Sequence, residues 1–153
     1  MSIEYRRASL GEIDLLVRTR IQVLRAANRL DVDADLSEVA AQSRDYYLRA
    51  LTDDTHTGYL AFDEGDFAGA GGVSYFRVMP TCHNPTGWKA YIMNMYVRPA
   101  SRRQGIATHI LDLLVKDARK RGIGCISLEA TEAGRPLYTK YGFIPMTHEM
   151  ELP

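Results

Sequence analysis

A short basic segment of the chain contains the residue types that bind a phosphate group. It runs from Val97 to Thr108, reads V-R-P-A-S-R-R-Q-G-I-A-T, and joins a strand pattern to a helix pattern. The first turn of a helix has unpaired backbone N–H groups and the positive end of the helix dipole, so it attracts anions. Gly105 removes a Cβ from that turn, while Arg102 and Arg103 add positive charge. The segment therefore predicts a site for a phosphorylated ligand.

The same segment has a plainer interpretation, as a basic strand-to-helix turn with an ordinary N-cap at Ser101. The common nucleotide motifs do not decide between the two interpretations, because neither motif occurs. Gly69, Gly71 and Gly72 lack the G-x-G-x-x-G spacing, and the chain has no G-x-x-x-x-G-K-[ST] loop.

The elements around this segment follow from apolar periodicity and from turn residues. A capping box at Ser9–Glu12 opens the first helix, and the strongest helical stripe begins just after Gly105. The expected order is a short strand (3–7), two helices (9–28 and 37–51), three strands (57–62, 67–76 and 89–97), a long helix (105–121), a strand (125–130), a short helix (133–141) and one or two final strands (143–152). This order predicts an α/β fold in which helices cover both faces of a mixed sheet.

Length and charge restrict the class of protein. At 153 residues we expect a single domain, 1–153, whose core needs no disulfide or metal. The 19 basic and 19 acidic residues cancel, which argues against a nucleic-acid partner, because such proteins concentrate positive charge. Two cysteines are too few for a disulfide framework, and no apolar run reaches the ~18 to 20 residues of a membrane span. We therefore expect a cytoplasmic protein with no membrane partner.

Two motifs in the second half resemble those of the GNAT superfamily of acetyl-CoA-dependent N-acetyltransferases. The run Arg102–Ala107 matches the family pattern R/Q-x-x-G-x-G/A and follows a strand that ends in Val-x-Pro. Pro136–Phe143 is similar to the family's x-x-Y-x-x-x-G-F segment, and Ile126–Ala130 to the strand that precedes it. Either motif alone is weak evidence, but both occur in the family's order and spacing.

The resemblance implies the GNAT fold, a mostly antiparallel mixed sheet that is split at a cofactor cleft. The cleft would lie between the strand that ends at Val97 and the strand at 125–130. Main-chain groups of the first strand would bind the pantetheine arm of acetyl-CoA, and backbone amides at the start of the long helix would bind its pyrophosphate. The implied contacts are Met95, Tyr96, Val97, Arg102, Arg103, Gln104, Gly105, Ile106, Ala107 and Thr108.

The expected reaction is direct attack of an amine on the thioester of acetyl-CoA in a ternary complex. An alkyl amine with a pKa near 10 is mostly protonated at neutral pH, so it must first lose a proton. The departing thiolate benefits from an acid, and the resemblance gives that role to Tyr138. The alternative for Tyr138 is an ordinary core tyrosine with its hydroxyl at the surface.

The chain departs from the family pattern at the general base. Many members have a carboxylate where this chain has Met93 and Asn94, and neither side chain accepts a proton at neutral pH. A second departure is Thr131, where members often have an asparagine that contacts pantetheine. By residue type alone, the base has four other candidates, Glu129, Glu132, His83 and His109; otherwise the proton leaves through water. The acidic loop with Asp31, Asp33 and Asp35 either attracts a cationic amine or is simply solvated.

The sequence thus predicts an N-acetyltransferase that moves acetyl from acetyl-CoA to a primary amine of an unidentified small molecule, without a metal. Two alternatives remain open: transfer to a protein or peptide amine, and a non-catalytic sensor that binds acyl-CoA. A homodimer is left open, and the sequence does not identify the acceptor, the base or the range of acyl groups.

Overall fold

The sheet is the framework of the computed structural model, which describes residues 2–153. Its strands lie in chain order and are β1 (Ile3–Arg7), β2 (His56–Asp63), β3 (Asp66–Arg77), β4 (Trp88–Val97) and β5 (Ile126–Leu128). The first four strands pair antiparallel, and β5 pairs parallel with β4. The predicted mixed, mostly antiparallel sheet is confirmed.

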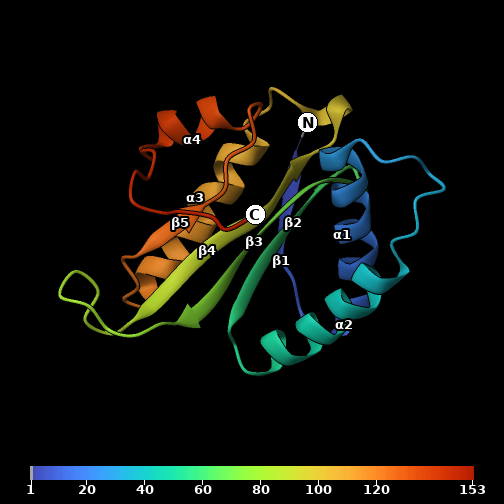
Figure 1. Cartoon of the computed structure of the whole chain (residues 1–153). Helices are drawn as coiled ribbons and strands as arrows, with labels where there is room; N and C mark the ends of the chain where they lie inside the picture. The colour runs from blue at the N-terminus through green and yellow to red at the C-terminus, as the bar shows by residue number, and fades with distance from the viewer. Residues whose placement is uncertain (1) are drawn as a thin grey trace.

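Helices cover both faces of this sheet, as predicted (Figure 1). On one side lie α1 (Ile13–Asn28), which a 3₁₀ turn at Leu10–Glu12 precedes, and α2 (Ser37–Thr52). On the other side lie α3 (Ile106–Lys120) and α4 (Arg135–Tyr141). None of the helices within residues 2–153 has the length and apolar character needed to span a membrane.

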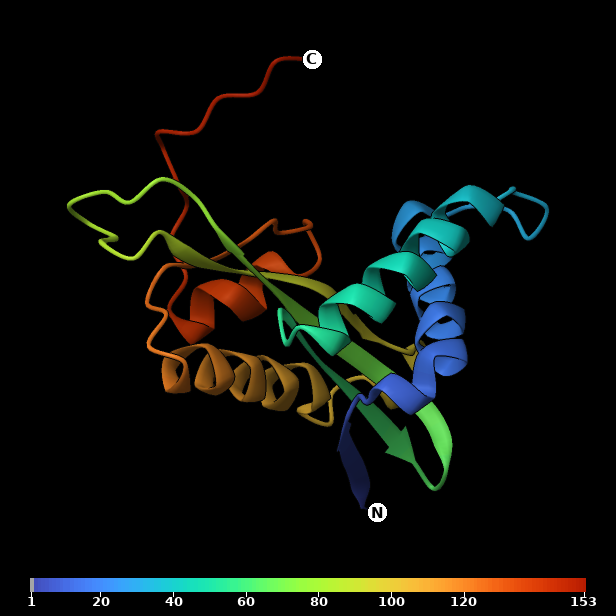
Figure 2. The same cartoon turned by 90° about the horizontal axis from the view of Figure 1, so that it is seen from below.

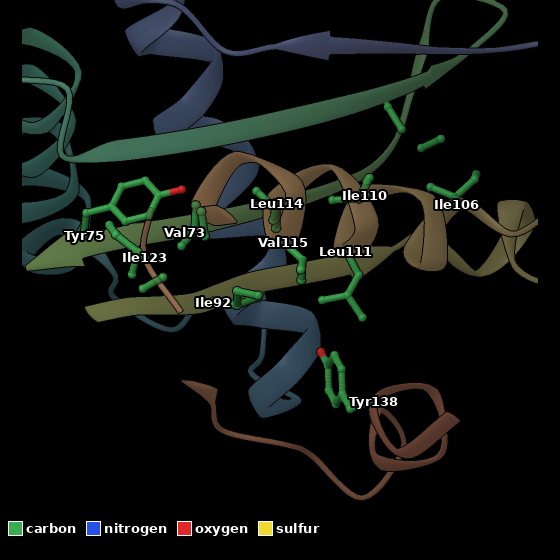
Figure 3. Packing of buried hydrophobic residues seen from close by; sticks show 14 residues of the cluster. Val73, Tyr75, Ile92, Ile106, Ile110, Leu111, Leu114, Val115, Ile123 and Tyr138 are labelled. Atoms are coloured by element: carbon green, nitrogen blue, oxygen red, sulfur yellow. The ribbon is translucent and has the colours of Figure 1, made fainter. Parts of the chain in front are cut away.

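A separate apolar cluster fills the space on each face of the sheet. The apolar stripe of α3 packs against β2, β3 and β4, and its members are Ile106, Ile110, Leu111, Leu114, Val115 and Ala118 (Figure 3). On the other face, Leu16 of α1 and Tyr47 of α2 pack with Leu60 and Phe62 of β2. Burying one such large side chain contributes roughly 1.5–3 kcal/mol, so the sheet is held from both sides.

A partly buried carboxylate joins the C-terminal end of α3 to the sheet. Asp117 accepts hydrogen bonds from the Tyr75 hydroxyl at 2.6 Å, from the Thr57 hydroxyl at 2.8 Å and from Arg121 Nε at 3.1 Å. Arg7 of β1 lies 3.3 Å from its other oxygen. Burial acts to raise the pKa of Asp117, but the bonds from Tyr75 and Thr57, together with the charges of Arg121 and Arg7, outweigh it and hold the pKa below its ordinary value. The ionised carboxylate therefore fixes this end of α3.

The sheet opens beyond the short contact of β4 with β5. Only Ala90–Ile92 pair with Ile126–Leu128, so the later residues of β4 have no strand beside them on that side. A β-bulge lies where the strands separate, because Asn94 and Met95 of β4 stand opposite the single residue Gly71 of β3. Bulges bend a strand and interrupt its pairing. The predicted opening between these two strands is confirmed.

The prediction of one or two final strands within residues 143–152 is wrong. The chain after α4 forms no strand up to Pro153, and its last residues extend away from the rest of the molecule (Figure 2). Its apolar side chains are exposed, with exposed fractions of 84% for Ile144 and 99% for Met150. Pro145 cannot donate to a ladder, and β5 offers only three residues to pair with. Alternating residues alone do not make a strand when no long edge is available.

Candidate active site

The free edge of β4 is the first part of the candidate site. The amide of Arg98 donates to the carbonyl of Ala68 on β3 at 2.8 Å, so residue 98 directs its backbone toward β3. Backbone groups alternate along a strand, so Val97 and Met95 direct theirs toward the opening, while Tyr96 faces β3. The Val97 carbonyl accepts a hydrogen bond from Arg102 Nε at 3.3 Å. Among the three predicted contacts on this strand, Met95 and Val97 present their main chain to the opening.

The start of α3 is the second part. Gly105 caps the helix in the left-handed region, with φ of 77°, and the first helical hydrogen bond runs from the His109 amide to the Gly105 carbonyl at 3.0 Å. No amide from residue 103 to residue 108 has a hydrogen-bond acceptor within residues 2–153. Nothing lies within 4 Å of the position that a Cβ on Gly105 would take. This turn is an open row of backbone donors.

The charged residues beside this turn differ in their availability. Arg98 Nε donates to the buried Ser101 hydroxyl at 2.6 Å, and its Nη2 lies 3.6 Å from a carboxylate oxygen of Asp63. Ser101 therefore anchors Arg98 and is not the N-cap of α3, which corrects the plainer interpretation of this segment. Arg102 and Arg103 are exposed, and neither has a carboxylate within 4 Å in the described chain. These two arginines keep their positive charge available to a ligand.

Tyr138 projects from α4 toward α3 and the sheet (Figure 3). Its ring packs edge-on against Phe143, with the centroids 6.1 Å apart, and it belongs to the same apolar cluster as Leu111 and Ile92. A Cβ on Gly134 would lie 2.9 Å from the Tyr138 ring, so this glycine lets the ring lie close to the main chain. Burial raises the pKa of Tyr138, and its hydroxyl has no hydrogen-bond partner within residues 2–153. The group is a protonated donor that the protein leaves unused.

A cavity of about 240 Å³ lies on the other face of the sheet, between α1, α2 and the strands. Two consecutive residues of the β4 bulge, Met93 and Asn94, form part of its wall. Its other lining residues are Arg20, Gln42, Ser43, Tyr46, Tyr47, His56 and Ser74. Because the bulge residues border this cavity and Met95 follows them at the opening, one short stretch of β4 borders both the cavity and the opening between β4 and β5.

His56 is a buried titratable group in the wall of this cavity. Its Nδ1 lies 2.9 Å from the Tyr46 hydroxyl, which lies 2.5 Å from the Ser74 hydroxyl. A Cβ on Gly72 would come within 2.9 Å of the imidazole, so the glycine provides the space for the ring. Burial, followed by the nearby charges of Arg20 and Arg121, lowers the pKa of His56 to about 4. The imidazole is therefore neutral at physiological pH.

Comparison with known proteins places this geometry in a family. The acetyltransferase (GNAT) family profile matches residues 21–143, which is most of the chain. The chain belongs to the GNAT family of acetyltransferases. Acetyl-CoA is the co-substrate of this family, so the resemblance inferred from the two motifs is confirmed.

Solved structures agree with this assignment. A predicted acetyltransferase from Clostridium acetobutylicum, solved with acetyl-CoA, is 34% identical with a TM-score of 0.89, and the match covers 99% of this chain and 96% of that one. A GCN5-related N-acetyltransferase from Ralstonia eutropha JMP134 is 29% identical with a TM-score of 0.81 and coverage of 99% and 98%. An aminoglycoside acetyltransferase from an uncultured soil sample, 23% identical with a TM-score of 0.75 and coverage of 100% and 99%, shares the fold. A comparison with curated protein sequences finds no match.

The family's co-substrate can be tested against the residues present. Three features suit a pyrophosphate: the row of free amides at 103–108, the open Cβ position of Gly105, and Arg102 and Arg103, which have no carboxylate partner in the described chain. The unpaired edge at Met95 and Val97 suits an extended arm that hydrogen-bonds like a strand. These features fit acetyl-CoA. Within the described residues, no group of three or more His, Cys, Asp or Glu side chains is arranged to hold a metal ion.

The sequence did not reveal the residues of the cavity. The four base candidates chosen by type, Glu129, Glu132, His83 and His109, are exposed and lie outside its wall. The acidic loop also lies outside it, and Asp35 instead accepts a hydrogen bond from the Ser37 amide at the start of α2. His56, Tyr46 and Ser74 were missed because no short-range pattern connects them. The nearest available signal is the set of strand glycines Gly69, Gly71 and Gly72, because glycines in a strand allow a close approach without identifying the partner.

Proposed function

We propose that this GNAT acetyltransferase moves acetyl from acetyl-CoA to a primary amine of a small molecule. The observation that carries the proposal is the cavity of about 240 Å³ whose wall includes Met93 and Asn94, directly before the free edge at Met95. Pockets for drug-sized ligands are roughly 300–1,000 Å³, so this one suits a compact acceptor. An amine held there is next to the place proposed for the thioester.

For the co-substrate, we assign the phosphates to the amides of residues 103–108, with Arg102 and Arg103 as mobile counter-ions. The main chain of Met95 and Val97 holds the arm along the β4 edge. The other predicted contacts contribute through their backbone amides, at Gln104, Ile106, Ala107 and Thr108. The side chain of Ile106 is not available to the ligand, because it is buried in the core. This arrangement fixes the thioester at the bulge.

The chain handles the amine proton without a carboxylate. None of the described residues lining the cavity is Asp or Glu, and His56 with a pKa of about 4 is a weak proton acceptor. The acceptor therefore reacts as the neutral amine, and its proton leaves through water. The polar groups of Tyr46, Ser74 and Asn94 orient the amine and exclude competing nucleophiles.

Tyr138 is the proposed acid for the leaving sulfur. Its hydroxyl is unpaired within residues 2–153, and burial keeps its pKa above the ordinary value for tyrosine, so the phenol remains protonated throughout the working range. A hydrogen bond from this hydroxyl stabilises the thiolate as it departs, which typically contributes about 10²- to 10⁴-fold in rate.

One observation favours a different function. The absence of a carboxylate at Met93 and Asn94 would also suit a sensor that binds acyl-CoA and transfers nothing. Release of free CoA from acetyl-CoA, followed by mass measurement of the acetylated product, separates the candidates across a panel of small amines and short peptides. Our proposal requires at least one small amine to be acetylated. Acetylation of peptides alone supports a protein N-acetyltransferase, and binding of acetyl-CoA without any transfer supports the sensor.

We place this reaction in the cytoplasm. Both cysteines, Cys82 and Cys125, are free in the structure, and neither is needed to hold the fold together. Free thiols persist in a reducing compartment, which supports this placement.

A further inference from the structure

The only charged side chain on the described wall of the acceptor cavity is Arg20 of α1. We propose that the acceptor is a compact amine that also carries a carboxylate, and that Arg20 binds this carboxylate. The inference rests on the proposed function, because it describes the occupant of the same cavity. It adds the chemical class of the substrate.

Arg20 has donors to spare. Its Nη1 donates to Asn94 Oδ1 at 3.1 Å, and no carboxylate in residues 2–153 lies within 4 Å of its guanidinium. A guanidinium has five N–H donors, of which this bond uses one. On the same two helices, Arg44 pairs with Asp14 and Arg49 with Asp45. Arg18 and Arg25 also have no carboxylate within 4 Å in the described chain, but they do not line the cavity. Among the described residues, Arg20 is thus the one cation without a counter-ion that faces the cavity.

The field of Arg20 reaches the groups beside it. Its charge contributes to the lowered pKa of His56, after burial, and opposes the effect of burial on the pKa of Tyr47. Because no acidic side chain lines the cavity, a ligand with several ammonium groups would meet this positive charge without compensation. A carboxylate would instead form a charge-assisted pair with the guanidinium, in two parallel hydrogen bonds where its orientation permits.

The bond to Asn94 makes the position of Arg20 useful for catalysis. Asn94 belongs to the β4 bulge, so the guanidinium is held at the border between the cavity and the opening. A carboxylate bound there fixes one end of the acceptor and leaves its amine directed by the neutral polar groups of Ser43, Tyr46 and Ser74. The volume of about 240 Å³ suits an acceptor the size of an amino acid.

The test compares matched acceptors that differ only in charge. The probes are leucine with leucinamide, and 4-aminobutanoate with its carboxamide, and kcat/KM is measured by CoA release. Within each pair, the ratio of the two values is compared between wild type, Arg20→Gln and Arg20→Lys. The intrinsic reactivity of each amine cancels in this comparison, because the same two amines are used with every variant.

The matched control is Arg18→Gln. Arg18 lies on the same helix, is exposed and does not line the cavity. We expect the carboxylate acceptor to be preferred by wild type and by Arg18→Gln, and the preference to fall about 10- to 100-fold in Arg20→Gln, as for a lost hydrogen bond to a charged group. Arg20→Lys should retain part of it. An unchanged ratio in Arg20→Gln would overturn the inference. Phosphoethanolamine carries a phosphate in place of the carboxylate, and a preference for it that depends on Arg20 and exceeds the preference for the carboxylate probes would also overturn the inference.

A binding measurement keeps this inference separate from the proposed function. Calorimetry with CoA-saturated protein compares leucine with leucinamide and 4-aminobutanoate with its carboxamide, and needs no turnover. Binding of a carboxylate probe that is weakened in Arg20→Gln, with acetyl-CoA affinity unchanged, supports the Arg20 site even if no acceptor is acetylated. Acetylation of amines with the same ratio within each pair in wild type and Arg20→Gln contradicts the Arg20 site and leaves the proposed function standing.

Discussion

The hydroxyl oxygen of Tyr46 lies 2.9 Å from Nδ1 of His56 and joins α2 to the first residue of β2. The two rings meet edge-on, with their centroids 5.3 Å apart. This contact fixes the plane of the imidazole, whose other nitrogen lies against Gly72. The proposed acceptor cavity therefore contains a neutral, oriented histidine and no carboxylate among its described lining residues.

Buried neutral His56 should make the fold sensitive to acid. Its pKa is about 4 in the folded protein and about 6.5 when unfolded, so the unfolded state binds more protons between these values. The contribution of neutral His56 to the free energy of unfolding is complete above pH 6.5 and is lost as the pH falls toward 4. Between pH 7 and pH 4.5, urea unfolding should show that the free energy of unfolding falls by about 2 kcal/mol more in wild type than in His56→Gln. Equal losses in the two proteins would show that His56 is not buried in its neutral form.

The rate should follow the ionisation of the acceptor. With no carboxylate base in the cavity, only the neutral amine reacts, and an alkyl amine with a pKa near 10 gains neutral form about tenfold per pH unit. We expect log kcat/KM to rise with a slope near one between pH 7 and pH 9. A plateau that begins near pH 7 would reveal a protein base that we have not identified.

Removing the hydroxyl of Tyr138 should affect turnover and little else. Tyr138→Phe keeps the packing against Phe143, and the lost hydroxyl has no partner within residues 2–153. We expect kcat to fall at least about tenfold while acetyl-CoA affinity and the melting temperature stay nearly unchanged. The matched control is Tyr141→Phe, on the same helix, whose hydroxyl donates to Asp112 at 2.8 Å. If both variants retain wild-type kcat, Tyr138 is a core residue only.

Asp117 should be important for stability and not for chemistry. Asp117→Asn removes the charge that faces Arg121 and Arg7, and its amide cannot accept all the bonds that the carboxylate accepts from Tyr75 and Thr57. Losing a hydrogen bond to a charged group typically costs about 1.5–3 kcal/mol, and this carboxylate is only partly buried. A lower urea midpoint with unchanged kcat per folded molecule is the expected outcome. Asp112→Asn, at a partly exposed pair with Lys116 on the same helix, serves as the comparison and should cost less than about 1 kcal/mol.

The sequence predicted the elements that local pattern determines. The stripe from Ile106 to Ala118 defined α3, and the turn residues around Gly65 defined the β2–β3 hairpin. The phosphate-binding character of the turn at Gly105 also followed from residue type, since it needs only neighbours in the chain. Such features depend on residues a few positions apart.

What the sequence did not predict depends on distant residues meeting. The acceptor cavity brings together Arg20, Tyr46, His56 and Asn94 from four elements, and its contacts follow from the β4 bulge. The C-terminal segment shows the opposite error. Its alternation from Ile144 to Leu152 matched a strand, but strand formation needs a partner edge, which local pattern does not report.

Acetyl-CoA should bind at the start of α3, and the two glycines that flank this helix allow a direct test of this site. Gly105 and Gly122 lie at opposite ends of α3 and have φ of 77° and 78°. At both positions, nothing lies within 4 Å of the place that a Cβ would take. Replacing either with Glu therefore imposes a similar backbone strain, of about 1–2 kcal/mol.

Calorimetric titration with acetyl-CoA compares wild type, Gly105→Glu and Gly122→Glu at the same salt concentration. We predict that Gly105→Glu loses at least about tenfold in affinity, because its carboxylate would lie against the phosphates, while Gly122→Glu binds like wild type. If folded Gly105→Glu binds acetyl-CoA as tightly as wild type does, the phosphates do not bind at the start of α3.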